Sequence, residues 1–106
     1  MRGGEGEMAK ASAQMVLTNA VGLHARPSVK LTKLAKGYGA TIELASSADG
    51  PWIDAKSIVK VMAMKAPKGT VLHLRGQGAE ARDAVAALAS LVERDFDEDH
   101  ADAAAG

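Results

Sequence analysis

A histidine, an arginine and a proline stand close together near the start of the chain, at His24, Arg26 and Pro27. Proline is tolerated in a first helical turn, because its missing N–H would have no intrahelical acceptor there, so a helix is expected to begin just after His24. The first N–H groups of a helix attract anions, and Arg26 adds donors that match a phosphate. An unprotonated imidazole is a good nucleophile toward phosphorus. The three residues indicate a histidine that takes up a phosphoryl group.

Two further histidines are weaker candidates. His73 alternates with Leu72 and Leu74, which is typical of the solvated side of a strand, and His100 lies in an acidic tail that cannot position a side chain. A histidine near a helix start is more often an ordinary surface residue than a nucleophile. The residue types alone therefore leave phosphoryl chemistry at His24 as one hypothesis.

Composition narrows the class of protein. The chain has 106 residues and no cysteine, which fits one domain held by packing alone and excludes disulfides and thiolate metal sites. No apolar run approaches the roughly 20 residues that span a bilayer, and the leader lacks a signal peptide's apolar stretch, so we expect a soluble cytoplasmic protein. No metal or cofactor is predicted.

Charge is unevenly distributed, although the formal net charge is zero. Residues 15–94 carry eleven basic and six acidic side chains, whereas the chain from Asp95 onward carries only acidic ones. A basic body can attract nucleic acid, but one Trp, one Tyr and one Phe offer little surface for base stacking. An acidic protein partner is favoured.

Hydrophobic periodicity predicts seven elements. Strands are expected at Met15–Thr18, Ala40–Ala45, Trp52–Ile53 and Val71–Arg75. One helix should follow His24 and stop at Gly37, and a short one should begin after an N-cap at Ser57 and end before Pro67. The last helix is expected to carry one apolar stripe: Ala81, Val85, Leu88, Ala89, Val92 and Phe96.

The expected order is βαββαβα. It predicts an α+β open-faced β-sandwich, with a four-stranded antiparallel sheet and three helices on one face. We expect residues 1–13 to be a disordered leader or a segment added for expression. Residues 14–96 should form the domain, and residues 97–106 an acidic, disordered tail.

The string Gly22-Leu23-His24-Ala25-Arg26-Pro27 resembles the active-site motif of the HPr family, the histidine phosphocarriers of the bacterial phosphotransferase system. A second block, Lys56-Ser57-Ile58 followed by Met62, resembles the family's regulatory-serine segment. The resemblance covers about Gln14 to Arg94 and implies the same fold order. It implies a phosphoryl carrier rather than an enzyme that turns over a small molecule alone.

By this resemblance, His24 would accept a phosphoryl group on its ring Nδ1 from enzyme I, whose phosphate comes from phosphoenolpyruvate. His24 would then pass the group to an enzyme IIA-type acceptor. Arg26 would neutralise the phosphate, and Pro27 would fix the helix start. Too tight a phosphate site would stall transfer, so stabilisation and release must balance.

The resemblance also implies a regulatory site and a docking face. An HPr kinase/phosphorylase would act on Ser57, although any helix here would favour a serine N-cap. The docking face would combine the first helix with the short second one. Its expected residues are Lys33, Lys36, Ile58, Val59 and Lys60, with Ile58 or Val59 pointing outward.

Three classes of function remain open at this point: a phosphocarrier, an interaction module controlled by Ser57 phosphorylation, and a nucleic-acid binder, which is the least favoured. The branch of the phosphotransferase system also stays open between sugar uptake, a nitrogen-linked relay and the dihydroxyacetone kinase system. We expect a monomer that binds neither nucleic acid nor membrane.

Overall fold

The computed structural model of the chain describes residues 9–97. Four strands form one sheet: β1 (Lys10–Val16), β2 (Thr41–Ala45), β3 (Ile53–Asp54) and β4 (Val71–Gln77). Three α-helices, α2 (Ala25–Lys36), α3 (Ile58–Ala63) and α4 (Ala81–Glu93), precede a short 3₁₀ turn, η1 (Asp95–Asp97). The expected α+β class and element order are confirmed.

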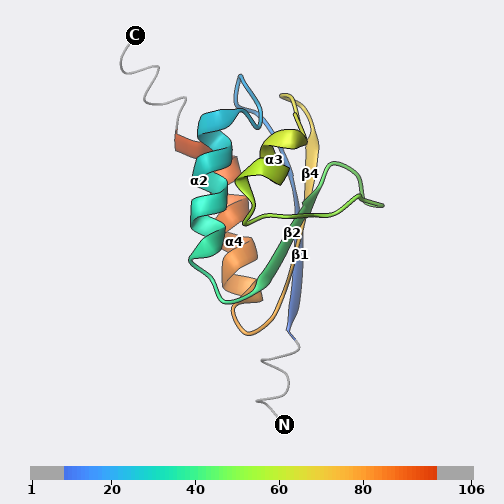
Figure 1. The fold of residues 1–106 in the computed structure, drawn as a ribbon, viewed down its shortest axis with the longest axis vertical. Helices are drawn as coiled ribbons and strands as arrows, with labels where there is room; N and C mark the ends of the chain where they lie inside the picture. The colour runs from blue at the N-terminus through green and yellow to red at the C-terminus, as the bar shows by residue number, and fades with distance from the viewer. Residues whose placement is uncertain (1–8, 98–106) are drawn as a thin grey trace.

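The sheet has the order β1-β4-β2-β3, and every neighbouring pair is antiparallel. Side chains alternate along β4, where Leu72 and Leu74 are buried while Val71 and Arg75 are exposed. Such alternation is typical of a sheet with one covered face. Figure 1 shows α2, α3 and α4 on one side of the sheet, so the other face is open.

The core lies between this sheet face and the helices. It includes Leu31 of α2, Val61 of α3 and Leu88 of α4, all with no exposed surface. At Gly76 of β4, an added Cβ would lie 3.1 Å from Val85 Cγ2 of α4. The absence of a side chain therefore lets α4 pack close to the centre of the sheet.

The first strand departs from the sequence expectation. β1 begins at Lys10 rather than Met15 and ends at Val16, with Lys10 opposite Gln77 and Val16 opposite Val71. Residues 10–13 are therefore part of the sheet, and the expected leader boundary at residue 13 is wrong. Residues 1–8 and 98–106, which include most of the predicted leader and tail, lie outside the described residues.

Two smaller boundaries also differ. β3 is Ile53–Asp54, one residue later than expected, and Trp52 lies against the Arg75 guanidinium, 4.0 Å from ring centroid to Cζ, beside the open face. The final helix ends at Glu93, so Phe96 is not part of its stripe. Phe96 has a φ of 57°, is fully buried, and its carbonyl accepts a 2.8 Å hydrogen bond from Lys30 Nζ.

Replacing Phe96 with alanine should lower the free energy of unfolding by about 3–5 kcal/mol, because a fully buried ring is removed. Denaturant unfolding followed by circular dichroism measures the change. Val59→Ala is the control, since Val59 is 74% exposed and its truncation should cost less than about 0.5 kcal/mol. Equal losses for the two variants would contradict the assignment of Phe96 to the core.

Candidate functional site

His24 is the N-cap of α2. Its backbone is extended, with φ −84° and ψ −170°, and its carbonyl accepts the first helical hydrogen bond from the Ser28 N–H at 3.0 Å. The imidazole is exposed and makes no capping hydrogen bond to the helix. Its nucleophilic ring is therefore presented to solvent where the helix dipole is positive.

The first turn of α2 begins with two residues that carry backbone N–H donors. Ala25, Arg26 and Pro27 are its first three residues, and Pro27 has no N–H, so the turn's leading backbone donors belong to Ala25 and Arg26. The Arg26 side chain is exposed, whereas Pro27 is fully buried. Helix start, arginine and proline therefore lie where the sequence predicted them.

The loop before His24 is held by a buried asparagine. Asn19 Nδ2 donates a 2.8 Å hydrogen bond to the Gly22 carbonyl, which also accepts from the His24 N–H at 2.9 Å. The Gly22 N–H donates back to the Asn19 carbonyl at 3.2 Å. Asn19 is 1% exposed, and its Oδ1 has no hydrogen-bond partner within the described residues.

The segment that follows α3 packs against the same loop. The Leu23 N–H donates a 2.8 Å hydrogen bond to the Ala66 carbonyl, and Gly22 has a φ of +63°. A Cβ at Gly22 would overlap the Ala66 carbonyl oxygen and lie 2.9 Å from the Pro67 carbonyl carbon. Glycine is therefore required here both by its backbone conformation and by the space available.

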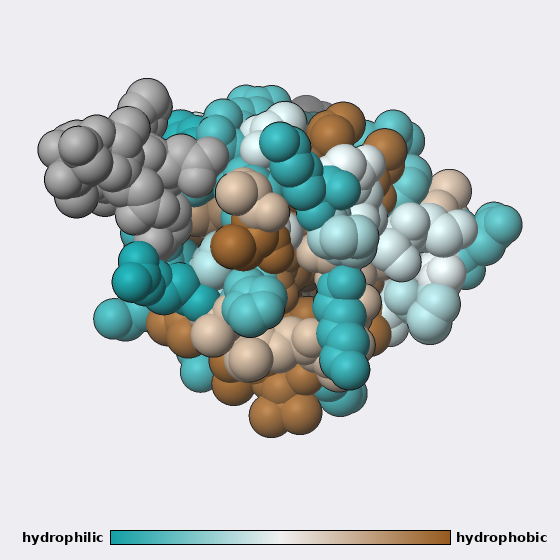
Figure 2. Space-filling view, turned by 90° about the horizontal axis from the view of Figure 1, so that it is seen from above, coloured by the Kyte–Doolittle hydropathy of each residue, from teal (hydrophilic) through white to brown (hydrophobic). Residues whose placement is uncertain are grey.

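A hollow of about 420 Å³ lies between the loop, the start of α2 and the chain after α3. Its lining residues are mostly apolar: Val21, Leu23, His24, Ala25, Met62, Lys65, Ala66 and Pro67. Figure 2 looks onto this end of the molecule, where hydrophobic and hydrophilic side chains alternate on the surface. His24 and Lys65 are the two polar side chains of the hollow.

The predicted docking residues divide into two groups. Lys60 and Val59 of α3 are exposed and Ile58 is half-buried, so Val59 is the outward-pointing member of that pair. Lys33 and Lys36 are also exposed but lie in the last turn of α2. A rise of 1.5 Å per residue puts them about 14–18 Å along the helix from His24.

Ser57 caps α3, as predicted. Its Oγ accepts a 3.3 Å hydrogen bond from the Lys60 N–H, and its side chain is half-buried. The neighbouring Lys56 turns away from the cap, because its Nζ donates a 2.8 Å hydrogen bond to the Tyr38 carbonyl, two residues past the end of α2. The structure thus gives Ser57 a structural role in starting the helix.

Sequence reasoning did not identify Asn19 or Lys65 as site residues. In the sequence, Asn19 marks only the end of the first strand, and Lys65 resembles the other surface lysines. Lys65 matters because it lines a hollow with His24, which is distant in sequence, whereas Asn19 acts through a local hydrogen bond to Gly22 that its residue type alone does not specify.

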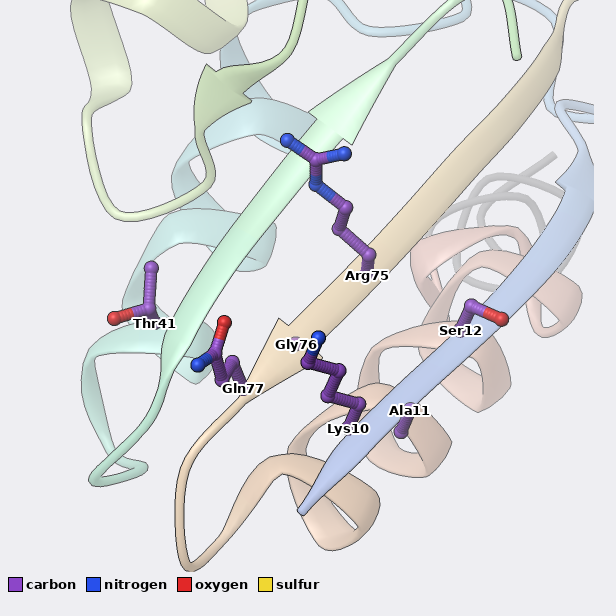
Figure 3. Close-up of a pocket in the computed structure, with 7 residues that line it drawn as sticks. All are labelled: Lys10, Ala11, Ser12, Thr41, Arg75, Gly76 and Gln77. Carbon is purple, nitrogen blue, oxygen red and sulfur yellow. The ribbon is translucent and has the colours of Figure 1, made fainter. Parts of the chain in front are cut away.

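A second hollow, of about 450 Å³, lies on the open face of the sheet and does not include His24. Figure 3 shows its lining side chains on β1, β4 and β2, among them Lys10, Arg75 and Thr41. Arg75 is paired there with Glu43 at 2.7 Å. Across residues 9–97, no group of three or more His, Cys, Asp or Glu side chains is placed to hold a metal ion.

Comparison with known protein families tests the family resemblance of the Gly22–Pro27 motif. The profile described as "PTS HPr component phosphorylation site" matches residues 11–94, which is most of the chain. The chain belongs to the PTS HPr family. The family is one of phosphocarriers, so the chain is a phosphocarrier of the phosphotransferase system and not an independent catalyst.

Individual relatives agree with this assignment. The chain is 37% identical over 86 residues to the phosphocarrier protein HPr of Xylella fastidiosa (strain 9a5c), covering 81% of this chain and 94% of that one. It is 32% identical over 83 residues to the phosphocarrier protein NPr of Escherichia coli (strain K12), covering 78% and 91%.

A solved structure, HPr-C-His from Thermoanaerobacter tengcongensis, superposes with a TM-score of 0.77 at 30% identity, covering 83% of this chain and 97% of that one. The HPr-like fold read from the sequence is therefore confirmed. Among the described residues of this HPr-family chain, no helix is long and apolar enough to cross a membrane.

Gly22→Ala should lower the free energy of unfolding by about 2 kcal/mol or more, because strain at a positive φ adds to overlap with the Ala66 carbonyl. Denaturant unfolding tests this. Gly69→Ala is the matched control, since Gly69 also has a positive φ of 95° but an added Cβ would have no atom within 4 Å. Its expected cost is about 1 kcal/mol. Equal costs would contradict the tight fit of the loop.

Ser57→Ala should lower the free energy of unfolding by about 1 kcal/mol, because α3 loses the acceptor for the Lys60 N–H. Thermal unfolding measures the loss, with Ser57→Asp as the variant that retains a capping oxygen. A Ser57→Ala protein as stable as the parent chain would contradict the capping role.

Proposed function

We propose that His24 is the phosphoryl acceptor of this phosphocarrier, taking the group from enzyme I and passing it to an enzyme IIA-type protein. The observation that carries the proposal is the exposed imidazole at the N-cap of α2, which makes no capping bond to its own helix. A histidine buried or engaged as a cap would not be available to an incoming phosphorus atom.

The transfer itself is a displacement at phosphorus. A lone pair on an imidazole ring nitrogen, Nδ1 by family resemblance, forms the new N–P bond, and the donor's bond to phosphorus breaks with its electron pair leaving on the donor. The second transfer repeats this step with His24 as the leaving group. The carrier is regenerated, and no small molecule is consumed by the chain alone.

The start of α2 stabilises the charged group while it is held. The backbone donors of Ala25 and Arg26 and the positive end of the helix dipole favour a dianion on His24. The Arg26 guanidinium adds a full positive charge, while buried Pro27 fixes the direction of the first turn. Helix-dipole effects of this kind are worth about 0.3–1 kcal/mol at an exposed site, which is modest enough to permit release.

The docking face would be the surface around His24 rather than the whole of α2. Val21 and Met62 line the hollow with His24, and Val59 lies one helical turn before Met62 on α3. Val21, Val59 and Met62 are 56%, 74% and 40% exposed, and exposed apolar residues of this kind are typical of an interaction surface. Lys60 supplies positive charge on α3, whereas Lys33 and Lys36 lie farther away along α2 and would contribute at longer range. An acidic partner with an apolar patch fits this surface.

Regulation through Ser57 stays a prediction. Phosphate on Ser57 would sit at the N-terminus of α3 but would add negative charge to a face that favours an acidic partner, and so would weaken docking. An HPr kinase/phosphorylase would be the enzyme responsible. We also propose that the chain acts as a monomer in the cytoplasm.

Incubation with enzyme I and phosphoenolpyruvate should add one acid-labile phosphoryl group to the chain, and His24→Ala should abolish it. Intact-protein mass spectrometry at neutral and acid pH measures the addition. His73→Gln is the control, because His73 lies on the sheet and should leave the yield unchanged. Undiminished phosphorylation of His24→Ala would sink the proposal.

Lys60→Glu should lower kcat/KM for enzyme I about tenfold at low salt, because an attractive charge on the docking face becomes repulsive. Added salt should shrink the difference by screening both charges. Arg82→Glu makes the same change of net charge on an exposed residue in the first turn of α4, and it should leave kcat/KM unaltered. The same loss in both variants would point to overall charge rather than to a docking face.

A further inference from the structure

Lys65 stands at a backbone position that favours glycine. It follows Met64, the C-cap of α3, and has a φ of 50°, with its N–H donating a 3.1 Å hydrogen bond to the Met62 carbonyl. Helices very commonly end with a glycine in this left-handed conformation, because a side chain there is strained. A lysine at this point therefore suggests that its side chain serves a purpose.

The position of Lys65 indicates what that purpose is. It lines the same hollow as His24, together with the apolar side chains of Val21 and Met62. His24 comes from the start of α2 and Lys65 from the chain after α3, so two separate parts of the fold bring the two residues to one hollow. Both residues are exposed, so solvent partly screens the attraction between a lysine ammonium and a phosphoryl group on His24, and a modest effect is expected.

We propose that Lys65 is a second cation for the phosphoryl group on His24, in addition to Arg26. This inference rests on His24 being the acceptor. Arg26 belongs to the helix that begins just after His24, whereas Lys65 belongs to a segment fixed to the loop by the Leu23–Ala66 hydrogen bond. The phosphoryl group would be held by charges from two elements, and its transfer potential would depend on both.

An alternative is that Lys65 contacts the acidic partner and not the phosphoryl group. The phosphorylation equilibrium of the free carrier distinguishes these two roles of Lys65. A contact made only in the complex changes rates, but it leaves the equilibrium between the free phosphorylated and unphosphorylated carrier unaltered. A contact with the phosphoryl group in the free carrier shifts that equilibrium toward the phosphorylated form.

The experiment measures the ratio of phosphorylated to unphosphorylated chain at equilibrium with enzyme I and fixed concentrations of phosphoenolpyruvate and pyruvate. Lys65→Gln and Lys65→Gly should each lower this ratio roughly three- to fivefold, and Lys65→Arg should restore it. The effect should diminish with added salt. Lys68→Gln is the control, because Lys68 is an exposed lysine of the same segment that does not line the hollow.

Lys65→Gly also distinguishes the effect of losing the charge from an effect on the stability of the fold. Glycine relieves the strain at this φ, so the melting temperature should stay the same or rise while the phosphorylated fraction falls. A lower fraction in a protein of undiminished stability cannot come from unfolding. An unaltered equilibrium ratio in Lys65→Gln would overturn the proposal, including the case in which kcat/KM falls and the lysine serves docking alone.

A second readout does not need enzyme I. Phosphoramidate, a small phosphoryl donor, can phosphorylate histidine directly, and the ¹⁵Nζ resonance of Lys65 should then shift while that of Lys68 does not. If enzyme I fails to phosphorylate the parent chain, the proposed function falls, yet this resonance still decides the role of Lys65. An unshifted Lys65 resonance in chain phosphorylated at His24 would overturn the proposal.

Discussion

The arrangement at His24 depends on one close contact, between the loop that precedes α2 and the chain that follows α3. Gly22 packs against the Ala66 and Pro67 backbone with no room for a Cβ, and the Leu23 N–H donates to the Ala66 carbonyl. These contacts join segments more than 40 residues apart. Because α2 begins directly after this loop, they fix both where the helix starts and where its positive end points.

The rest of the fold supports that contact. Antiparallel pairing of β1 and β2 with β4 leaves one covered sheet face, and burial of Leu31, Val61 and Leu88 holds three helices against it. Packing of the core thus places the start of α2 beside the end of α3. The side chains at those ends, His24 and Lys65, need not be buried themselves, and both are exposed to solvent.

Local sequence rules predicted the parts of the site that are set by neighbours in the chain. Proline in a first turn located the start of α2, and serine located the cap of α3. The same rules failed where the outcome depends on distant residues. The polar start of β1 is a strand because β4 pairs with it, and Phe96 leaves the helical stripe because a left-handed turn packs it into the core. Lys65 was missed for the same reason, because it meets His24 only in the folded chain.

The central claim is that the phosphoryl group is held at the N-terminus of α2. Amide ¹H–¹⁵N spectra recorded before and after phosphorylation by enzyme I test it most directly. We expect the largest shifts at the amides of His24, Ala25 and Arg26, with no comparable change at Ser12, Thr41 or Gln77 on the open sheet face. Largest shifts on the sheet face, or on α4, would contradict the account.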